Sequence, residues 1–503
     1  MFEAAELGRV VSKDDYRQRE PLLRAELLAA QNLLREAGGF PVIVVFAGVD
    51  GAGKGETVNL LNAWMDPRWI VTRAFAEPSD EERERPPYWR FWRELPPRGR
   101  IGLFMSSWYS RPVLDRVYGR IGPSAFQERL NRIVEFEHTL AADGALILKF
   151  WMHLDKRGQR KRLKHLEEDP LQRWKVNDLA WKQWRMYDKF IAAAEQAIRQ
   201  TSRGDAAWMI IEGADARYRS LTVGETIRDA LQQRLAEARD PGPASATRPV
   251  RATAAKKATA KPPRVMSILS SLDMSQAVKK ADASRLIDLH QGRLNLLQRK
   301  AAARGVSTIL VFEGWDAAGK GGVIRRTTAA LDARDYRVIP IAAPTDEERA
   351  HHYLWRFWRH LSRAGRVTIF DRSWYGRVLV ERVEGFATEK EWRRAYAEIN
   401  QFEDQLVSHG IVLVKYWMHV TKDEQLRRFK ERQATLHKQW KLTDEDWRNR
   451  ERWDAYEQAV NDMIEQTSTR EAPWTLVAAN DKTFARVKVL TTVCDRLERA
   501  LGR

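Results

Sequence analysis

Two stretches of the 503-residue chain combine glycines, an aspartate and a lysine directly after a short apolar run. The first is GVDGAGKG, from Gly48 to Gly55, and the second is GWDAAGKGG, from Gly314 to Gly322. Glycines let the backbone curl so that several N–H groups converge on phosphate oxygens, and a lysine adds a mobile positive charge. The pattern predicts two phosphate-binding P-loops. The residues of the second cradle are Gly314, Ala317, Ala318, Gly319, Lys320, Gly321 and Gly322.

Neither loop ends in the Ser or Thr whose hydroxyl ordinarily binds Mg²⁺, because glycine follows each lysine. Another oxygen must then hold the metal. Asp316, like Asp50 in the first loop, would supply that oxygen or orient the attacking group. A second acid is expected at the end of a neighbouring strand, and Asp371 follows the apolar run VTIF. We therefore expect Asp316 and Asp371 to bind Mg²⁺.

The two loops belong to an internal repeat with an offset of 266 residues. The same offset places YWRFWRELPPRGRIGLFMSSWYSR, from Tyr88, on LWRFWRHLSRAGRVTIFDRSWYGR, from Leu354, with 13 of 24 positions identical. It also places KFWMH, from Lys149, on KYWMH, from Lys415. A constant register over this length indicates two copies of one domain, which we expect at residues 1–240 and 266–503. The segment 241–265 contains six Lys or Arg and no acid, and is expected to be a linker rich in Ala, Pro and Lys.

The two copies differ where the metal is expected. Met105 stands in the first copy where the second has Asp371, and Ser106 stands where the second has Arg372. Methionine does not ligate Mg²⁺, and serine does not neutralise phosphate charge. The sequence therefore predicts that the first copy is degenerate and that its Asp50 and Lys54 are remnants of a site.

Short apolar runs alternate with long helical patterns in both halves. Amphipathic helices are expected near residues 20–35 and 285–304, each followed by a buried strand that leads into a P-loop. Further strands are expected at 70–76, 101–105, 145–151 and 208–211, and at 338–342, 367–370, 411–417 and 475–477. This alternation predicts an α/β fold, with two tandem copies of a P-loop kinase-like three-layer α/β/α domain around a parallel sheet.

A basic helical region at 421–441 is followed by the acidic turn TDED and a helix at about 447–466. In a P-loop kinase a helical lid over the phosphates lies at this place. The cations of this region line an anionic channel or form an ordinary charged helix surface. They are Arg427, Arg428, Lys430, Arg432, Lys438 and Lys441.

The tryptophans of the WRFWR blocks have the spacing of core residues on a helix. Arg356 and Arg359 in the second block face a phosphate-filled groove or a solvated, salt-bridged surface. The histidines His153, His351, His352 and His419 show no metal-ligand spacing, so no catalytic role is assigned to them.

Taken together, FEGWDAAGKGG, FDRSWYGR, KYWMH, QWKLTDED and APW resemble the family-2 polyphosphate kinases. The fused form looks like the two-domain class that acts as polyphosphate:AMP phosphotransferase and makes ADP. The resemblance implies Mg²⁺ as cofactor, polyphosphate and AMP as substrates, and the basic region as a lid. It also implies that Asp316, Lys320, Asp371 and Arg372 are catalytic and that Arg377 and Lys441 bind phosphate.

Composition fits this resemblance without proving it. The chain has 86 Lys and Arg against 68 Asp and Glu, a formal charge of +18 that indicates a polyanionic partner. It has a single cysteine, Cys494, no leader-like N-terminus and no apolar run of about 18 residues, so we expect a cytoplasmic protein without a membrane partner. Recognised nucleic-acid modules are absent, so no nucleic acid is expected, and a homo-oligomer is left open.

Two other functions remain open from the residues alone. One is a polyphosphate- or ATP-dependent kinase acting on a nucleoside diphosphate or another small acceptor, because a P-loop binds phosphates whatever is attached to them. The other is a nucleic-acid-binding NTPase, suggested by the charge and by the 20 tryptophans. AMP as acceptor rests on the family resemblance.

Overall fold

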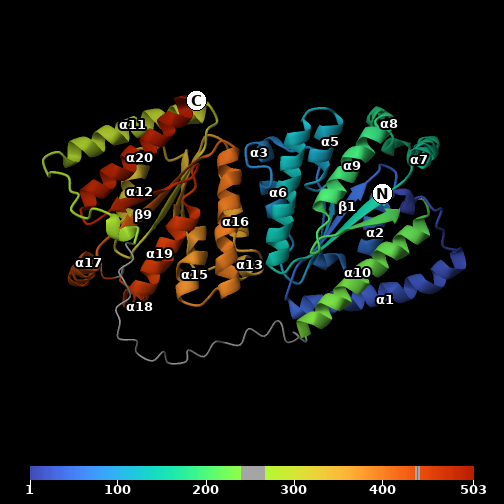
Figure 1. Cartoon of the computed structure of the whole chain (residues 1–503), viewed down its shortest axis with the longest axis horizontal. Helices are drawn as coiled ribbons and strands as arrows, with labels where there is room; N and C mark the ends of the chain where they lie inside the picture. The colour runs from blue at the N-terminus through green and yellow to red at the C-terminus, as the bar shows by residue number, and fades with distance from the viewer. Residues whose placement is uncertain (240–266, 437–438, 440–441, 503) are drawn as a thin grey trace. The chain divides into compact units, whose positions relative to one another are not determined.

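A computed structural model describes residues 1–239, 267–436, 439 and 442–502. Contacts divide it into two compact units, each built around one sheet and formed mainly by one half of the chain (Figure 1). The expected linker at 241–265 lies outside the described residues, as do Lys438 and Lys441.

Each half contains a five-stranded sheet in which all the paired strands are parallel. The strands of the N-terminal half are β1 (Val42–Gly48), β2 (Ile70–Ala74), β3 (Ile101–Met105), β4 (Leu146–His153) and β5 (Trp208–Glu212). Those of the C-terminal half are β6 (Thr308–Gly314), β7 (Tyr336–Pro340), β8 (Val367–Asp371), β9 (Val412–His419) and β10 (Trp474–Ala478). The orders β2-β3-β1-β4-β5 and β7-β8-β6-β9-β10 are the same, so the sequence repeat folds into one topology twice.

Helices cover both faces of each sheet (Figure 1). In the N-terminal half, α1 (Lys13–Ala37), α2 (Lys54–Trp64) and α10 (Ala216–Arg239) pack together, as do α5 (Ser110–Val117), α6 (Pro123–Ala142) and α9 (Tyr187–Thr201). The corresponding groups in the C-terminal half are α11 (Ala283–Ala303), α12 (Lys320–Thr328) and α20 (Lys482–Gly502), and α15 (Val380–Val383), α16 (Glu389–Ser408) and α19 (Trp453–Thr467). The predicted α/β class with three layers is confirmed.

The remaining helices are short or lie near the loop ends of the sheets. The α-helices are α3 (Asp80–Arg83), α4 (Trp89–Glu94), α7 (Lys156–Glu168), α8 (Asp178–Arg185), α13 (Asp346–Arg349), α14 (Trp355–Trp358), α17 (Lys422–Ala434) and α18 (Asp444–Glu451). The 3-10 helices are η1 (Glu3–Ala5), η2 (Pro67–Trp69), η3 (Arg173–Lys175), η4 (Leu269–Ser271) and η5 (Trp374–Val378). Among the described helices, none has the length and apolar character needed to cross a membrane.

Most predicted elements differ from the structure by a few residues at their bounds, and the helix predicted near 20–35 spans Lys13–Ala37. Strand β7 begins at Tyr336, two residues before the predicted start, because its pairing with β8 aligns Tyr336 with Val367. The helix predicted at about 447–466 is two helices, α18 and α19, separated at Arg452. Helix α18 has only Asn449 buried, whereas α19 buries an apolar face, so the two segments pack on different surroundings.

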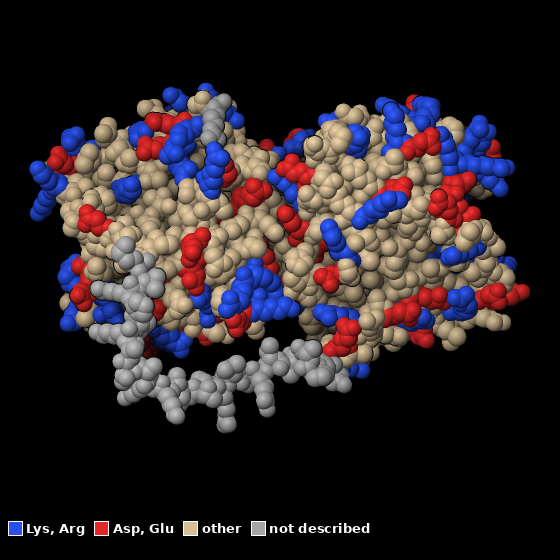
Figure 2. Space-filling model, in the orientation of Figure 1, with Lys and Arg blue, Asp and Glu red and all other residues tan. Residues whose placement is uncertain are grey.

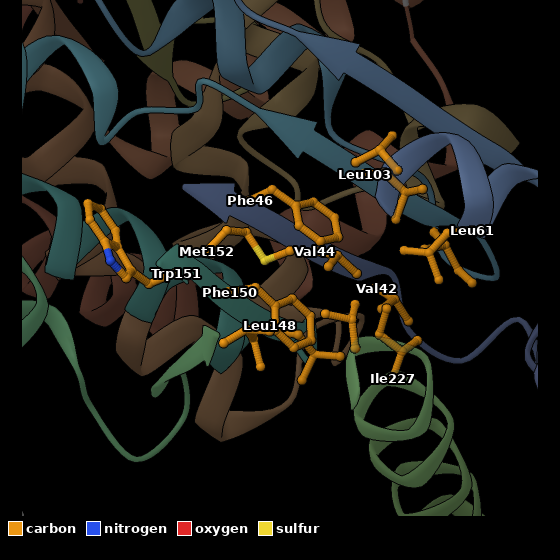
Figure 3. Close-up of a cluster of buried hydrophobic side chains, with 14 of the residues drawn as sticks. Val42, Val44, Phe46, Leu61, Leu103, Leu148, Phe150, Trp151, Met152 and Ile227 are labelled. Carbon is orange, nitrogen blue, oxygen red and sulfur yellow. The ribbon is translucent and has the colours of Figure 1, made fainter. Parts of the chain in front are cut away.

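The strands that lead into the loops are buried on both faces. In the N-terminal half, Phe46 of β1 stacks on Phe150 of β4 with ring centroids 5.5 Å apart. Figure 3 shows these rings among the side chains of neighbouring strands and helices, including Leu61 of α2 and Ile227 of α10. Burial on both faces explains why these strands read as continuous apolar runs.

A buried ion pair joins β9 to α16 in the C-terminal half. Lys415 of β9 donates hydrogen bonds to Glu403 Oε2 at 2.7 Å, to the Tyr375 hydroxyl at 2.8 Å and to the Thr467 carbonyl at 2.7 Å. The other carboxylate oxygen accepts from Trp374 Nε1 at 3.0 Å and from Tyr375 at 2.7 Å. The network therefore fixes the first turn of η5, directly after β8.

The N-terminal half contains the same network. Lys149 donates to Glu137 Oε2 at 2.7 Å and to the Tyr109 hydroxyl at 2.9 Å, and Trp108 and Tyr109 donate to the other oxygen. Burial raises the pKa of Glu403 and lowers that of Lys415, and the attraction between the two opposes both shifts. Residues of the SWY and K-[FY]-WMH motifs, which both halves share, therefore form a buried hydrogen-bond network in each half.

Replacing Lys415 with methionine should lower the free energy of unfolding of the C-terminal half by about 3 to 5 kcal/mol, because Glu403 would be left buried without its partner. Urea denaturation measures the loss. The matched control is Lys390→Met on the exposed surface of α16. Glu403→Leu added to Lys415→Met should recover much of the loss. A single variant as stable as the control would contradict this account of the network.

Candidate active site

The P-loop of the C-terminal half is wound tightly between β6 and α12. Gly314 has φ 148°, and a Cβ at this residue would lie 2.4 Å from the Met418 carbonyl oxygen, so the position requires glycine. Gly319 adopts the left-handed conformation just before α12 begins at Lys320. Ala317 has φ 61°, an uncommon conformation for a residue with a side chain. The strained backbone directs the loop toward the N-terminus of α12, where anions are favoured.

The charged side chains of this loop contact three different elements. Lys320 Nζ donates to the carbonyls of Gly314 at 2.6 Å and Trp315 at 3.2 Å, so it lies folded over the loop. Asp316 Oδ2 accepts a hydrogen bond from Asn449 of α18 at 2.9 Å, and its Oδ1 lies 3.4 Å from Arg372 Nη2. Asp316 thus joins the loop to α18 and to the segment after β8.

Asp371 and Arg372 lie at the end of the strand beside β6. Pairing of β6 with β8 places Asp371 opposite Phe312, two residues before the loop begins. Arg372 has φ 64°, and its N–H donates to the Phe312 carbonyl at 3.0 Å. Burial disfavours its charge, but Asp316 and Glu313 outweigh burial and raise the pKa of Arg372. The structure therefore brings all four predicted catalytic residues to one edge of the sheet.

Glu313 is a fifth charged residue here, which sequence analysis missed. It is the residue before Gly314, it is 5% exposed, and it accepts a hydrogen bond from Ser373 at 2.8 Å. Burial raises its pKa, while Lys320 and Arg372 act in the opposite direction. The repeat carried a usable signal, because Ala47 stands at the equivalent position of the first copy. Asn449 was missed as well, and its equivalent is Gln183.

Arg428 of α17 contacts the backbone of the P-loop with its guanidinium group. It donates to the carbonyls of Ala317 at 2.9 Å, Ala479 at 2.6 Å and Asn480 at 2.9 Å, and it pairs with Glu424 at 2.6 Å. Its side chain is only 3% exposed. The channel interpretation is therefore wrong for Arg428, whose charge supports the P-loop backbone.

Three other predicted arginines pair with acids on neighbouring helices. Arg377 lies 3.2 Å from Glu381 and has its guanidinium over the Tyr353 ring at 4.6 Å. Arg356 and Arg359 lie 3.3 Å from Glu348 and 3.0 Å from Glu347, so the salt-bridged alternative describes them. The tryptophans of this WRFWR block, Trp355 and Trp358, are buried as predicted.

His419 also lies close to the loop. It accepts a hydrogen bond from Trp315 Nε1 at 3.1 Å, and Trp315 stacks on Trp453 with ring centroids 3.7 Å apart. Burial lowers the pKa of His419 to about 4, so the imidazole is neutral near pH 7. These contacts indicate that His419 packs against the side chains next to the loop.

The loop of the N-terminal half has the same backbone, but fewer charged residues lie around it. Lys54 Nζ donates to the carbonyls of Gly48 at 2.7 Å and Val49 at 3.0 Å, as Lys320 does to its own loop. It also donates to Asp50 at 3.3 Å, so these two charges pair with each other. Ser106 has the left-handed φ of 51° that Arg372 has in the other half. The backbone of the site is retained there without Asp371 and Arg372.

A cavity of about 190 Å³ lies beside this first loop and is lined by Asp50, Lys54, Ser106 and aromatic side chains such as Tyr187 and Phe190. Four of its neutral residues replace charged ones of the second half. They are Ala47 for Glu313, Ser106 for Arg372, Tyr118 for Glu384 and Met186 for Arg452. The cavity keeps the cation Lys54 but lacks the two arginines, Arg372 and Arg452, whose charges could neutralise a polyanion.

The donor atoms around the second loop suit a hard cation. Asp316 and Asp371 offer carboxylate oxygens at neighbouring strand and loop ends. No group of three or more His, Cys, Asp or Glu in the described part of the chain is arranged to hold a metal by itself. Mg²⁺ commonly takes one or two carboxylates together with water and substrate phosphates, so two protein carboxylates fit this ion.

Comparison with known proteins gives matches over nearly the whole chain. A family model described as "Polyphosphate kinase 2" matches residues 10–239 and 276–502. A Pseudomonas aeruginosa protein named "Polyphosphate:AMP phosphotransferase" is 50% identical over 99% of both chains. A protein of the same name from Pseudomonas syringae pv. tomato is 47% identical over 100% of this chain and 99% of its own. The crystal structure titled putative polyphosphate kinase 2 from Pseudomonas aeruginosa covers both chains fully, with 48% identity and a TM-score of 0.88.

Replacing Arg428 with alanine should destabilise the C-terminal half by about 3 kcal/mol. The P-loop carbonyl of Ala317, the carbonyls of Ala479 and Asn480 after β10, and Glu424 would all lose their buried partner. The equivalent Arg162 is one-third exposed and pairs with Glu56, so Arg162→Ala should cost less than about 1 kcal/mol. Urea denaturation of both variants makes the comparison. Equal losses would show that Arg428 does not support the loop as described.

Proposed function

The chain belongs to the polyphosphate kinase 2 family, and we propose that it transfers the terminal phosphoryl group of inorganic polyphosphate to AMP, forming ADP. The observation that carries this function is the identity of 50% and 47%, over essentially the entire chain, to two proteins named polyphosphate:AMP phosphotransferase. The cluster of Lys320, Asp316, Asp371 and Arg372 at one sheet edge supplies the matching chemistry in the C-terminal half.

The reaction brings two anions together. Two unit charges 4 Å apart repel by about 4 kcal/mol at the effective dielectric of a protein surface, and several such pairs meet here. Catalysis is therefore mainly charge neutralisation and in-line positioning. A phosphate oxygen of AMP attacks the terminal phosphorus, and the bond from that phosphorus to the bridging oxygen breaks. The polymer leaves one unit shorter. The second pKa of a phosphate monoester is about 6, so the attacking oxygen is largely ionised at neutral pH.

The residues at the loop take the following roles in this proposal. The N–H groups at the start of α12 bind the transferred phosphate, and Lys320 exchanges its two carbonyl contacts for phosphate oxygens. Arg372 is held at the strand end by its backbone hydrogen bond to Phe312 and neutralises charge on the transferred group. Arg377 and Lys441 remain proposed phosphate contacts at the edge of the site, since Arg377 has Glu381 as its partner here and Lys441 lies outside the described residues.

We propose Mg²⁺ as the cofactor, held by Asp316 and Asp371. When bound, the ion neutralises phosphate charge and orients donor and acceptor oxygens. Asn449 and Arg372 then orient Asp316 from two sides. The same proposal makes the N-terminal half inactive in transfer, because Met105, Ser106 and Ala47 stand at the positions of Asp371, Arg372 and Glu313.

We also propose a cytoplasmic location and no nucleic-acid partner. A cytoplasmic location is supported by the single cysteine, Cys494, which is buried and has no second cysteine to pair with. The proposal includes no nucleic-acid partner, because the charged residues described at the site have roles in phosphate transfer. A homo-oligomer stays open.

The acceptor is tested with a panel of AMP, ADP, GMP and GDP, each incubated with long-chain polyphosphate and Mg²⁺ in the absence of ATP. Formation of ADP from AMP as the fastest reaction is expected. Faster phosphorylation of ADP or GDP would favour a nucleoside diphosphate kinase activity. No product from any acceptor until ATP is added would contradict polyphosphate as the donor.

Exchanging Asp371 for asparagine should lower kcat at least about 100-fold, because the site loses a metal oxygen and gains no compensating charge. Lys320→Ala should have an effect of similar size. The matched control in the other half is Lys54→Ala, which should leave kcat within about twofold. A Lys54→Ala enzyme as impaired as Lys320→Ala would contradict the assignment of transfer to the C-terminal half.

A further inference from the structure

Helix α7 of the N-terminal half is unusually basic. Its sequence KRGQRKRLKHLEE contains six Lys or Arg and two Glu, a formal charge of +4 (6 minus 2). The cations at positions 157, 160, 161 and 164 are exposed. They are three or four residues apart, so they share one face of the helix and repel one another. Like-charge pairs at this spacing destabilise a helix by about 0.2 to 0.5 kcal/mol each, a cost that an anionic ligand would remove.

The equivalent helix of the other half, α17, is largely neutralised. Its sequence KDEQLRRFKERQA has five Lys or Arg and three acids, a formal charge of +2 (5 minus 3). Arg427 pairs with Glu424 at 2.7 Å, and Arg428 is buried against the P-loop. The offset of 266 places Arg157, Gly158 and His165 on the three acids Asp423, Glu424 and Glu431. The first copy therefore lacks every acid of α17 and keeps four of its five cations, the exception being Leu166 in place of Arg432.

The exposed cations of α7 also lack protein partners. Arg157, Lys161 and Lys164 form no ion pair with any described residue, and Arg160 has only the Trp184 ring, at 5.5 Å. An ordinary solvated helix face commonly intersperses acids with such cations, as α17 does. The unpaired face of α7 differs from that pattern in the direction that favours a polyanion.

Helix α7 lies where an α/β sheet binds ligands. It follows β4 at the carboxyl end of that strand, and its Gln159 lines the cavity beside the first P-loop. In Figures 1 and 2 it lies at the upper right, where Lys and Arg side chains gather at the surface. The loop beside it has lost the groups for transfer, so an anion bound on α7 would be held without reacting.

We propose that the exposed face of α7, formed by Arg157, Arg160, Lys161 and Lys164, is a second binding surface for polyphosphate, in the half of the chain that does not carry the proposed transfer residues. This inference rests on the proposed function for its ligand. Polyphosphate fits because it carries regularly spaced charges, no side groups and enough length to be held at one place while its end reacts at another. Binding at a second place raises the effective concentration of the polymer end at the transfer site.

The test compares two triple variants with equal changes in charge. One is Arg157→Glu, Lys161→Glu and Lys164→Glu on α7, and the control is Lys13→Glu, Arg17→Glu and Arg24→Glu on the exposed side of α1. ADP formation is measured with tripolyphosphate and with long-chain polyphosphate as donors, over a range of salt. Binding of long-chain polyphosphate without AMP is measured by calorimetry. Thermal unfolding checks that both variants fold, and a glutamine version of the α7 variant replaces it where needed.

For the α7 variant, the KM for long-chain polyphosphate should rise about tenfold or more, with kcat unchanged. Its KM for tripolyphosphate should stay within about twofold of the parent. For long-chain polyphosphate, the slope of log KM against the logarithm of salt concentration should fall by about 2. This is about 0.7 for each of the three lost cation contacts. Calorimetry should show weaker binding for the α7 variant, whereas the α1 control should behave like the parent.

Three results would overturn the inference. They are an equal rise in KM for tripolyphosphate, an equal effect of the α1 control, and unchanged binding of long-chain polyphosphate to the α7 variant. Competition by a single-stranded oligonucleotide as strong as that by polyphosphate would reject the assigned ligand. Failure of the parent enzyme to form ADP from either donor would instead contradict the proposed function, and calorimetry would still decide whether α7 binds the polymer.

Discussion

The buried pair of Lys415 and Glu403 is the interaction on which the active edge of the sheet depends. It binds Trp374 and Tyr375, which follow Asp371 and Arg372 after one intervening residue, Ser373. A charge pair of this kind costs desolvation and is stable only when every partner is in place, so it tolerates one geometry of the turn after β8. The strained φ of Arg372 is held by that geometry.

The same pair in the N-terminal half explains how one scaffold keeps its shape although residues at the proposed site differ. Lys149 and Glu137 hold the turn after β3, and Ser106 there keeps the left-handed conformation of Arg372. The side chains that differ include those at the proposed phosphate and metal positions, such as Met105 for Asp371 and Ala47 for Glu313. In the proposed function, stability and catalysis thus depend on separate residues of one motif. The charged residues proposed for transfer lie in one half of the chain, and a basic helix lies in the other.

Much of this was predictable from sequence, and the remainder has identifiable causes. The repeat and the apolar strands predicted the topology, because burial on both faces leaves a clear pattern. The motif K-Y-W-M-H gave no sign that Lys415 is structural, since a buried ion pair depends on a partner distant in the chain. Arg428 read as a surface cation because its helix is polar, and its carbonyl partners have no sequence signal. Glu313 was hidden by its place at the end of an apolar strand, although the comparison with Ala47 would have marked it.

The central claim is that one fold occurs twice and that only the C-terminal copy binds the metal with the phosphates. The most direct measurement is an anomalous difference map from crystals soaked with Mn²⁺, AMP and tripolyphosphate. The account predicts a manganese peak at Asp316 and Asp371, with phosphate density over the loop that ends at Lys320. A peak of comparable height at Asp50 in the N-terminal half would contradict it.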